Sequence, residues 1–118
     1  AAKNGGALRV VNDQRGSPTY TKDLAVPFMR LVEQEKTGIY HVANSGSCTW
    51  FEFAGEIFRL LNMDVEIIPI SSDELERKAK RPAYSVFDMW KLQKKAGVKM
   101  RPWQEALKEY IGSTGAQW

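Results

Sequence analysis

The chain of 118 residues has one cysteine, one histidine and no long apolar run. Cys48 has no partner for an internal disulfide, and with His41 it cannot supply the four ligands of a structural zinc site. No segment approaches the roughly 20 apolar residues of a membrane-spanning helix, and residues 1–6 lack the apolar core of a signal peptide. We therefore expect no metal site and a reducing, cytoplasmic environment. Cys48 is then a small buried or capping residue, and His41 a packing or hydrogen-bonding residue.

The motifs of nucleotide-dependent catalysis are absent as well. No Gly-x-Gly-x-x-Gly and no Gly-x-x-x-x-Gly-Lys sequence occurs. Residues 112–115, Gly-Ser-Thr-Gly, resemble a phosphate loop but follow a predicted helix instead of preceding one. No tyrosine has a lysine four residues later, so the proton-transferring pair of the short-chain dehydrogenases is missing. We expect no catalytic residue in this chain.

The composition is that of an ordinary globular protein, with 43% hydrophobic and 26% charged residues. At about 100–150 residues per domain, the chain is one domain or a piece of one. Short β-branched runs alternate with helical apolar patterns, which is typical of the α/β class. We expect a small three-stranded, mostly parallel sheet with about four helices, the strands at 8–11, 39–43 and 65–70 and the helices at 21–35, 50–61, 89–96 and 103–111.

Local signals mark several helix ends. Thr49 and Glu52 have the spacing of a capping box ahead of the second helix. Pro27 favours a kink or a late start of the first helix, while Asp88 and Gly97 suit the start and end of the third. An apolar stripe gives the second helix a core-facing side: Trp50, Phe53, Ala54, Ile57 and Leu61.

The densest polar segment, residues 13–20, joins the first predicted strand to the first predicted helix, where α/β proteins present ligand-binding loops. Gly16 permits a close backbone approach. Its neighbours offer hydrogen-bond donors for sugar hydroxyls or phosphate: Gln14, Arg15, Ser17 and Thr19. The same residues fit equally well a turn whose side chains bond to their own backbone. Both interpretations remain open from the residues alone.

Residues 77–101 carry nine basic side chains and one acid. Such a run can attract polyanions. However, Lys91, Lys94 and Lys95 share one turn of a predicted helix, as in a solvated face, and no interleaved aromatic residues indicate nucleic-acid stacking. We expect no nucleic-acid partner. Arg81 is the exception, because Pro82 stiffens the backbone beside it and a guanidinium held there can contact a phosphate through two hydrogen bonds.

Taken together, several motifs resemble the C-terminal part of the dTDP-4-dehydrorhamnose reductases. The resemblance runs from residue 8 to residue 111, and motifs in the family's order are far more specific than any one alone. They are Val-Val-Asn-Asp-Gln-Arg-Gly-Ser-Pro-Thr-Tyr-Thr-Lys-Asp-Leu-Ala at 10–25, Gly-Ile-Tyr-His-Val-Ala-Asn-Ser-Gly at 38–46, Trp-Phe-Glu-Phe-Ala at 50–54, Lys-Arg-Pro-Ala-Tyr-Ser at 80–85, and Arg-Pro-Trp at 101–103.

The resemblance implies a fold and an activity. The family belongs to the extended short-chain dehydrogenase/reductases and reduces the 4-keto group of dTDP-6-deoxy-L-lyxo-4-hexulose with NADPH, giving dTDP-L-rhamnose. Its N-terminal Rossmann half holds the cofactor and the proton donor. This chain is then the C-terminal part of an NAD(P)-binding Rossmann-like fold, binds no cofactor and is inactive alone. Residues 8–112 form its substrate-binding lobe, between a flexible lead-in at 1–7 and a flexible tail at 113–118.

The same resemblance implies binding residues and partners. Arg15 stands where the family commonly has an aromatic residue. The strand at 40–44 would lie at the far edge of the parent Rossmann sheet, so the missing N-terminal half is a partner, and an exposed apolar edge favours a homodimer. The residues implied to contact the dTDP-sugar are Gln14, Gly16, Ser17, Pro18 and Thr19 in the pocket, with Arg81 and Ser85 near the nucleotide.

Two other functions fit the sequence. One is the corresponding lobe of a related nucleotide-sugar epimerase or dehydratase, against which the Asp-Gln-x-Gly-Ser-Pro-Thr loop argues. The other is a non-catalytic, reductase-like regulatory or interaction module. Stronger binding of UDP-sugars than of dTDP-sugars would indicate the first, and salt-sensitive DNA binding through Lys94 and Lys95 would indicate a basic version of the second.

Overall fold

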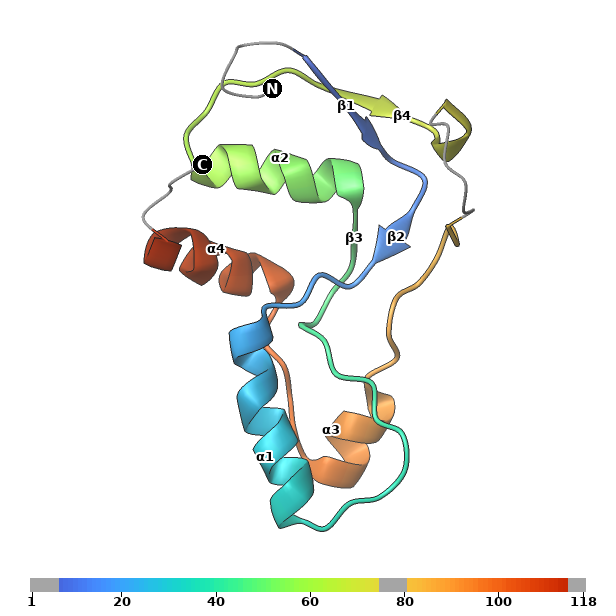
Figure 1. The fold of residues 1–118 in the computed structure, drawn as a ribbon, viewed down its shortest axis with the longest axis vertical. Coiled ribbons are helices and arrows are strands. Elements are labelled where there is room, and N and C mark those ends of the chain that lie inside the picture. Colours follow the sequence, from blue (N-terminus) through green and yellow to red (C-terminus); the bar gives the residue numbers. More distant parts are fainter. Residues whose placement is uncertain (1–6, 75–80, 115–118) are drawn as a thin grey trace.

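The computed structural model describes residues 7–74 and 81–114, and the molecule is elongated, with extents of 50 × 34 × 20 Å. Strands and α2 occupy one end, while α1 and α3 occupy the other (Figure 1). Most of the predicted lead-in and tail, and the basic residues at 77–80, lie outside the described residues. The elements are β1 (Leu8–Val11), β2 (Arg15–Gly16), the 3-10 helix η2 (Thr21–Leu24), α1 (Ala25–Glu33), β3 (Cys48–Thr49), α2 (Trp50–Leu60), β4 (Ile67–Ile70), the 3-10 helix η3 (Ser72–Glu74), α3 (Trp90–Ala96) and α4 (Trp103–Thr114).

The strands form two small sheets. β1 and β4 pair in parallel, with Leu8 opposite Ile67 and Val11 opposite Ile70. β2 and β3 pair antiparallel. The α/β class is confirmed, but two two-stranded sheets, one parallel and one antiparallel, replace the predicted three-stranded, mostly parallel one.

The predicted strand at residues 39–43 is wrong, because this segment forms no strand in the structure. A β-branched run becomes a strand only where a neighbouring strand completes its backbone hydrogen bonds. Here the carbonyl of Ile39 accepts a hydrogen bond from Lys91 Nζ at 2.9 Å instead. The Lys91 ammonium also lies 4.3 Å from the ring centroid of Tyr40, so this lysine is not part of a purely solvated face.

The helix ends follow the local signals. The capping box of α2 is complete: the backbone N–H of Glu52 donates to Thr49 Oγ1 and the backbone N–H of Thr49 donates to Glu52 Oε1. α1 starts late, two residues before Pro27 and after η2. Gly97 ends α3 with a φ of 68°, which favours glycine. α4 continues to Thr114, two residues past the predicted stop at Gly112.

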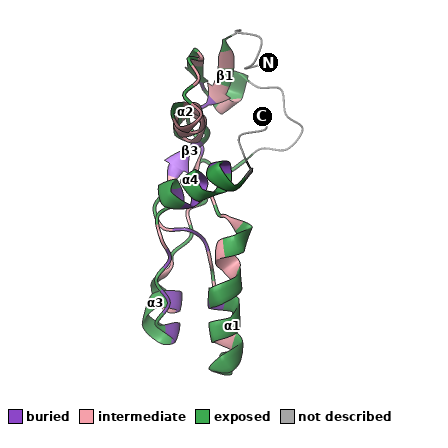
Figure 2. Cartoon of the chain, turned by 90° about the vertical axis from the view of Figure 1, so that its left-hand side faces the viewer, coloured by how far each residue is buried: buried purple, intermediate pink, exposed green. Residues whose placement is uncertain are grey.

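Two separate apolar clusters replace a single core, which the elongated shape explains (Figure 2). The first lies between α2 and α4 and the second beside α3 and α1. Buried members of the first are Cys48, Trp103, Leu107 and Ile111, with Phe53, Ile57, Leu60 and Leu61 packed against them. Buried members of the second are Leu92, Ala96, Val98 and Met100, with Leu31, Tyr40, Val42 and Met89 packed against them.

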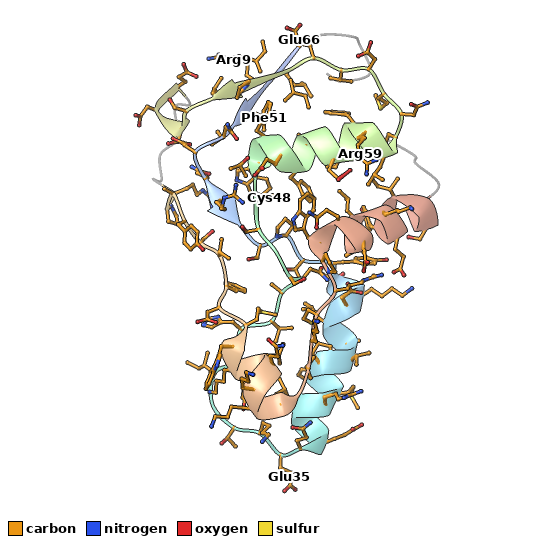
Figure 3. All side chains as sticks on the ribbon, turned by 180° about the vertical axis from the view of Figure 1, so that it is seen from behind. Arg9, Glu35, Cys48, Phe51, Arg59 and Glu66 are labelled. Atoms are coloured by element: carbon orange, nitrogen blue, oxygen red, sulfur yellow. The ribbon has the colours of Figure 1, made fainter. Side chains whose placement is uncertain are left out.

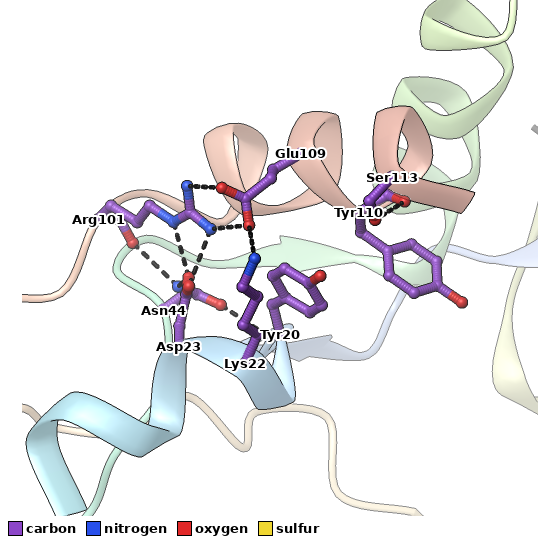
Figure 4. Close-up of polar contacts among 8 residues, drawn as sticks. All are labelled: Tyr20, Lys22, Asp23, Asn44, Arg101, Glu109, Tyr110 and Ser113. Carbon is purple, nitrogen blue, oxygen red and sulfur yellow. Dashed lines mark hydrogen bonds and ion pairs between the residues drawn. The ribbon is translucent and has the colours of Figure 1, made fainter. Parts of the chain in front are cut away.

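A polar network joins the two ends of the molecule (Figure 4). The Arg101 guanidinium, just before α4, donates two hydrogen bonds to the Asp23 carboxylate of η2 at 2.7 and 2.8 Å. Asn44 Nδ2 donates to the same carboxylate at 2.7 Å, and Asn44 Oδ1 accepts from the backbone N–H of Tyr20. Glu109 of α4 contacts the outer side of Arg101.

Candidate functional site

A pocket of about 430 Å³ opens where three chain segments meet. The segments are the polar loop through β2, the start of α2, and the stretch that leads toward α3. Its lining residues are Gln14, Arg15, Gly16, Ser17, Pro18, Cys48, Thr49, Trp50, Phe53, Arg81, Pro82, Ser85 and Phe87. Residues more than 70 positions apart in the sequence thus share one cavity.

Backbone hydrogen bonds from β2 bring the third segment to the pocket. The N–H of Arg15 donates to the carbonyl of Ala83 at 2.8 Å, and the N–H of Ser85 donates to the carbonyl of Arg15 at 2.9 Å. Gly16 allows this approach, because a Cβ there would lie 3.2 Å from Ser85 Oγ. Ser17 Oγ accepts from the N–H of Phe87 at 3.2 Å. The loop at 14–18 is therefore an organised pocket wall.

The side chain of Arg15 points to the start of α2 and is already paired. Its guanidinium donates to Ser47 Oγ at 3.0 Å and to Glu52 Oε1 at 2.9 Å. The pKa of Glu52 is lowered, first by the backbone N–H of Thr49 and further by the charge of Arg15. Glu52 thus caps α2 and neutralises Arg15 at the same time.

Two polar groups in the pocket wall have no partner among the described residues. Gln14 is 7% exposed, yet no hydrogen bond satisfies its carboxamide within the part of the chain that the structure describes. The Arg81 guanidinium is exposed and forms no ion pair with any described residue. The two side chains provide hydrogen-bonding capacity and one positive charge for a ligand.

Aromatic rings form the apolar part of the wall. Trp50, which the stripe predicts to face the core, is 56% exposed and lines the pocket, so that prediction is wrong for this residue. Phe53 does face the first cluster, and Phe87 is 45% exposed at the opposite segment. Sequence reasoning missed Trp50 and Phe87, although a tryptophan directly after a helix cap is a signal that could have been weighed.

Cys48 lies at the inner end of the pocket, beside β2, and is buried as predicted (Figure 3). Burial, together with the negative charge of Glu52, raises the pKa of its thiol to about 11. The thiol is therefore protonated at neutral pH and is not a nucleophile. His41 is exposed, and its ring centroid lies 5.0 Å from that of Phe87.

The pocket gathers six of the seven residues that the sequence assigns to ligand binding. Thr19 is the exception. It lines a second, more apolar pocket of about 420 Å³ between the loop at 18–21, α2 and α4. Pro18 and Phe53 border both pockets, so the two cavities are neighbours.

Other kinds of site find no support in the described residues. Within 7–74 and 81–114, no three histidine, cysteine or acidic side chains are grouped so that they could hold a metal ion. The described helices include none long and apolar enough to cross a membrane.

An α/β fold with an organised pocket of polar and aromatic groups is typical of domains that bind small molecules. Residues 1–115 match the family model described as the RmlD substrate binding domain. The chain therefore belongs to the RmlD substrate-binding domain family, which confirms the resemblance found in the sequence.

Individual proteins of similar sequence and structure support the same family assignment. The chain is 47% identical over 104 residues to the spore coat polysaccharide biosynthesis protein SpsK of Bacillus subtilis, covering 88% of this chain and 36% of that protein. It is 43% identical over 109 residues to a dTDP-4-dehydrorhamnose reductase of Streptomyces griseus, covering 85% of this chain and 35% of the relative. The crystal structure of dTDP-4-dehydrorhamnose reductase from Bacillus anthracis in complex with NADP superimposes with a TM-score of 0.89 at 41% identity, over 95% of this chain and 40% of that one.

The chain thus spans little more than a third of the length of these relatives. Its own residues do not fit a dinucleotide. The parallel strands β1 and β4 lead into a polar loop and the three-residue η3, and neither opens a glycine-rich turn before a helix. NADP is bound by the related reductase, and nothing in the described residues cradles it here.

Proposed function

We propose that this chain is the substrate-binding part of a dTDP-4-dehydrorhamnose reductase. In this role its pocket holds a dTDP-sugar, and the remaining part of the enzyme binds NADPH and transfers hydride and proton to the 4-keto group. The observation that carries the proposal is the pocket itself, which Gln14 and Arg81 both line, neither with a side-chain partner among the described residues, on a chain that belongs to the RmlD substrate-binding family. The isolated chain is then a binding domain without reductase activity.

The pocket residues take distinct roles in this proposal. Arg81 is the available cation and contacts the diphosphate, since the charge of Arg15 is paired with Glu52. Gln14 and Ser85 offer hydrogen bonds to the sugar and nucleotide. Gly16 and Pro18 shape the wall. Ser17 in this pocket and Thr19 in the neighbouring pocket offer further hydroxyl groups to the ligand.

The first experiment is a titration of the 118-residue chain with dTDP and dTDP-rhamnose, followed by amide NMR shifts. We expect shifts at residues 14–18 and 81–87. Competition that is stronger with UDP-sugars than with dTDP-sugars would instead support an epimerase or dehydratase lobe. A folded chain without shifts at millimolar ligand would contradict binding by this part alone. NADPH oxidation by the chain with the keto-sugar would contradict the division of roles.

Replacing Arg81 with alanine is expected to weaken dTDP binding about tenfold, because one charge-assisted contact to phosphate is worth about 1.5–3 kcal/mol in favourable geometry. Isothermal titration calorimetry measures the change. Arg59→Ala is the matched control: this arginine is also exposed but lies on α2 outside the pocket, paired with Glu56. Equal loss of affinity in both variants would show that only the overall charge matters.

An apolar surface on α1 indicates how the missing part of the enzyme docks. Phe28 is 65% exposed, and three further apolar side chains of this short helix are more than half exposed: Val26, Met29 and Val32 (Figure 2). Monomeric proteins rarely leave such a surface open. Because the matched part of this chain is little more than a third of the length of the relatives, we assign this surface to the rest of the reductase polypeptide.

Phe28→Glu is expected to reduce self-association of the isolated chain, which otherwise buries this surface weakly against another copy. Sedimentation velocity over a range of concentrations measures the effect. Arg30→Gln changes the charge of the same helix by the same amount and should leave self-association unchanged. A tight dimer at the lowest concentrations would mean that a second copy is the true occupant, and a wild-type chain that stays monomeric throughout would contradict an adhesive surface.

A further inference from the structure

We propose that Trp50 is the residue that recognises the nucleobase, by stacking its indole on the thymine ring of the ligand. The proposal rests on the proposed function, because it names the part of a dTDP-sugar that this side of the pocket receives. Neither the loop motif nor the family match assigns a role to this residue.

The position of Trp50 suits a stacking platform. It is the first residue of α2, where the capping box of Thr49 and Glu52 fixes the backbone. Its ring lies perpendicular to that of Phe53, with centroids 6.3 Å apart. Phe53 in turn packs at 5.8 Å against Trp103, which is buried in the first cluster. A chain of three aromatic rings thus anchors an exposed indole to the core.

The anchored indole leaves a ring face free. An edge-to-face contact with Phe53 can cover at most one face of Trp50, and the residue remains 56% exposed while it lines the pocket. Exposing so much apolar surface is unfavourable unless a ligand covers it. A rigid indole carries little conformational entropy to lose when a ligand binds.

The remaining chemistry of the pocket favours a base as the group that covers this face. Sugars and phosphates are recognised mainly through hydrogen bonds and charge, which Gln14 and Arg81 supply. An indole offers a single N–H donor and a large π surface, and every nucleobase has a matching π face. A nucleoside diphosphate satisfies all three groups at once, with its base on Trp50 and its phosphates toward Arg81.

Trp90 provides a close control. It is also the first residue of a helix, α3, and is 57% exposed, almost the same as Trp50. It lines neither of the two pockets described above. Removing either indole changes exposed apolar surface equally, so only a role in the pocket separates the two variants.

The test compares Trp50→Ala, Trp50→Phe and Trp90→Ala in calorimetric titrations with dTDP and with 2-deoxyribose 5-phosphate, which has no base. Stacking predicts about a tenfold loss of dTDP affinity in Trp50→Ala, a smaller loss in Trp50→Phe, which keeps a ring, and none in Trp90→Ala. Affinity for 2-deoxyribose 5-phosphate should not change. In the unaltered chain, dTDP should quench tryptophan emission, and Trp50→Phe should abolish that quenching.

The outcomes separate the inference from the proposed function. If dTDP binds and Trp50→Ala binds it equally well, stacking is wrong and the substrate-binding role stands. If Trp50→Ala weakens both ligands equally, the indole contacts sugar or phosphate instead of the base. If the folded, unaltered chain binds no dTDP, both the proposed function of this chain and the stacking role of Trp50 are wrong. If a variant does not fold, quenching of tryptophan emission by dTDP in the unaltered chain still tests whether the ligand binds beside an indole.

Discussion

Trp103→Ala is expected to lower the free energy of unfolding by about 4 kcal/mol, as is typical when a large buried aromatic side chain is removed. Trp103 is 5% exposed and central to the first apolar cluster, where it contacts Phe53 and packs with Leu107 and Ile111. Deleting the indole leaves a cavity between α2 and α4 that these helices cannot easily close. Urea denaturation followed by circular dichroism measures the loss.

Two variants make this prediction specific. Trp103→Phe should cost clearly less than the alanine substitution, because a phenyl ring fills much of the space and removes the indole N–H, which is buried without a hydrogen-bond partner. Glu105→Ala, at an exposed position of the same helix, should have little effect. A similar stability of the Trp103→Ala and Glu105→Ala variants would show that the first cluster does not hold this end of the molecule together.

Local parts of the fold were predictable because their causes are local. The capping box at Thr49, the late helix start near Pro27 and the glycine stop at Gly97 depend on neighbours within a few residues. The segment at 39–43 was not predictable in this way. Its β-branched residues have the composition of a strand, but strand formation depends on a partner elsewhere in space, and no described strand lies beside it.

Only part of the candidate site was predictable from the sequence, and it was again the part whose signal is local. The polar loop through Gly16 stands out because its composition is unusual between a strand and a helix. Arg81 stood out as a phosphate contact because of its place before Pro82, whereas Ser85 entered only through the resemblance. What brings this segment to the pocket is the backbone pairing with Arg15, which side-chain patterns do not encode. Thr19 shares the loop but faces the neighbouring pocket, because a turn sends successive side chains in different directions.

Trp50 shows the limit of helical periodicity. The spacing of apolar residues places it on the same stripe as Phe53 and Ile57, and those two do pack against the first cluster. A stripe indicates a direction around the helix, but it does not show where along the axis the neighbouring helix ends. At the first position of α2 the stripe faces the pocket instead of α4. The residue best suited to touch a ligand therefore looked like an ordinary core residue.

Arg101→Met is expected to lower the free energy of unfolding at neutral pH, and by more than any other single change in this polar network. Methionine keeps the apolar stem but removes the charge, which leaves the Asp23 carboxylate, only 15% exposed, without its main partner. The same substitution disconnects η2 from the start of α4, where the two ends of the molecule meet. Glu109→Gln, on the exposed side of Arg101, should cost less than about 1 kcal/mol.

The pH dependence tests whether the charge of Asp23 causes this loss. Hydrogen bonds from Arg101, then from Asn44, hold the pKa of Asp23 below its ordinary value of 3.8. A lowered pKa in the folded state means that the pair stabilises the protein fully above that ordinary value, and that the stabilisation is lost as the pH falls through the folded-state pKa. The gap between the unaltered chain and Arg101→Met should therefore be constant from neutral pH to about pH 5 and narrow below about pH 4. A gap that persists unchanged in acid would assign the loss to packing of the arginine stem, and the junction between the two ends would then be apolar in origin.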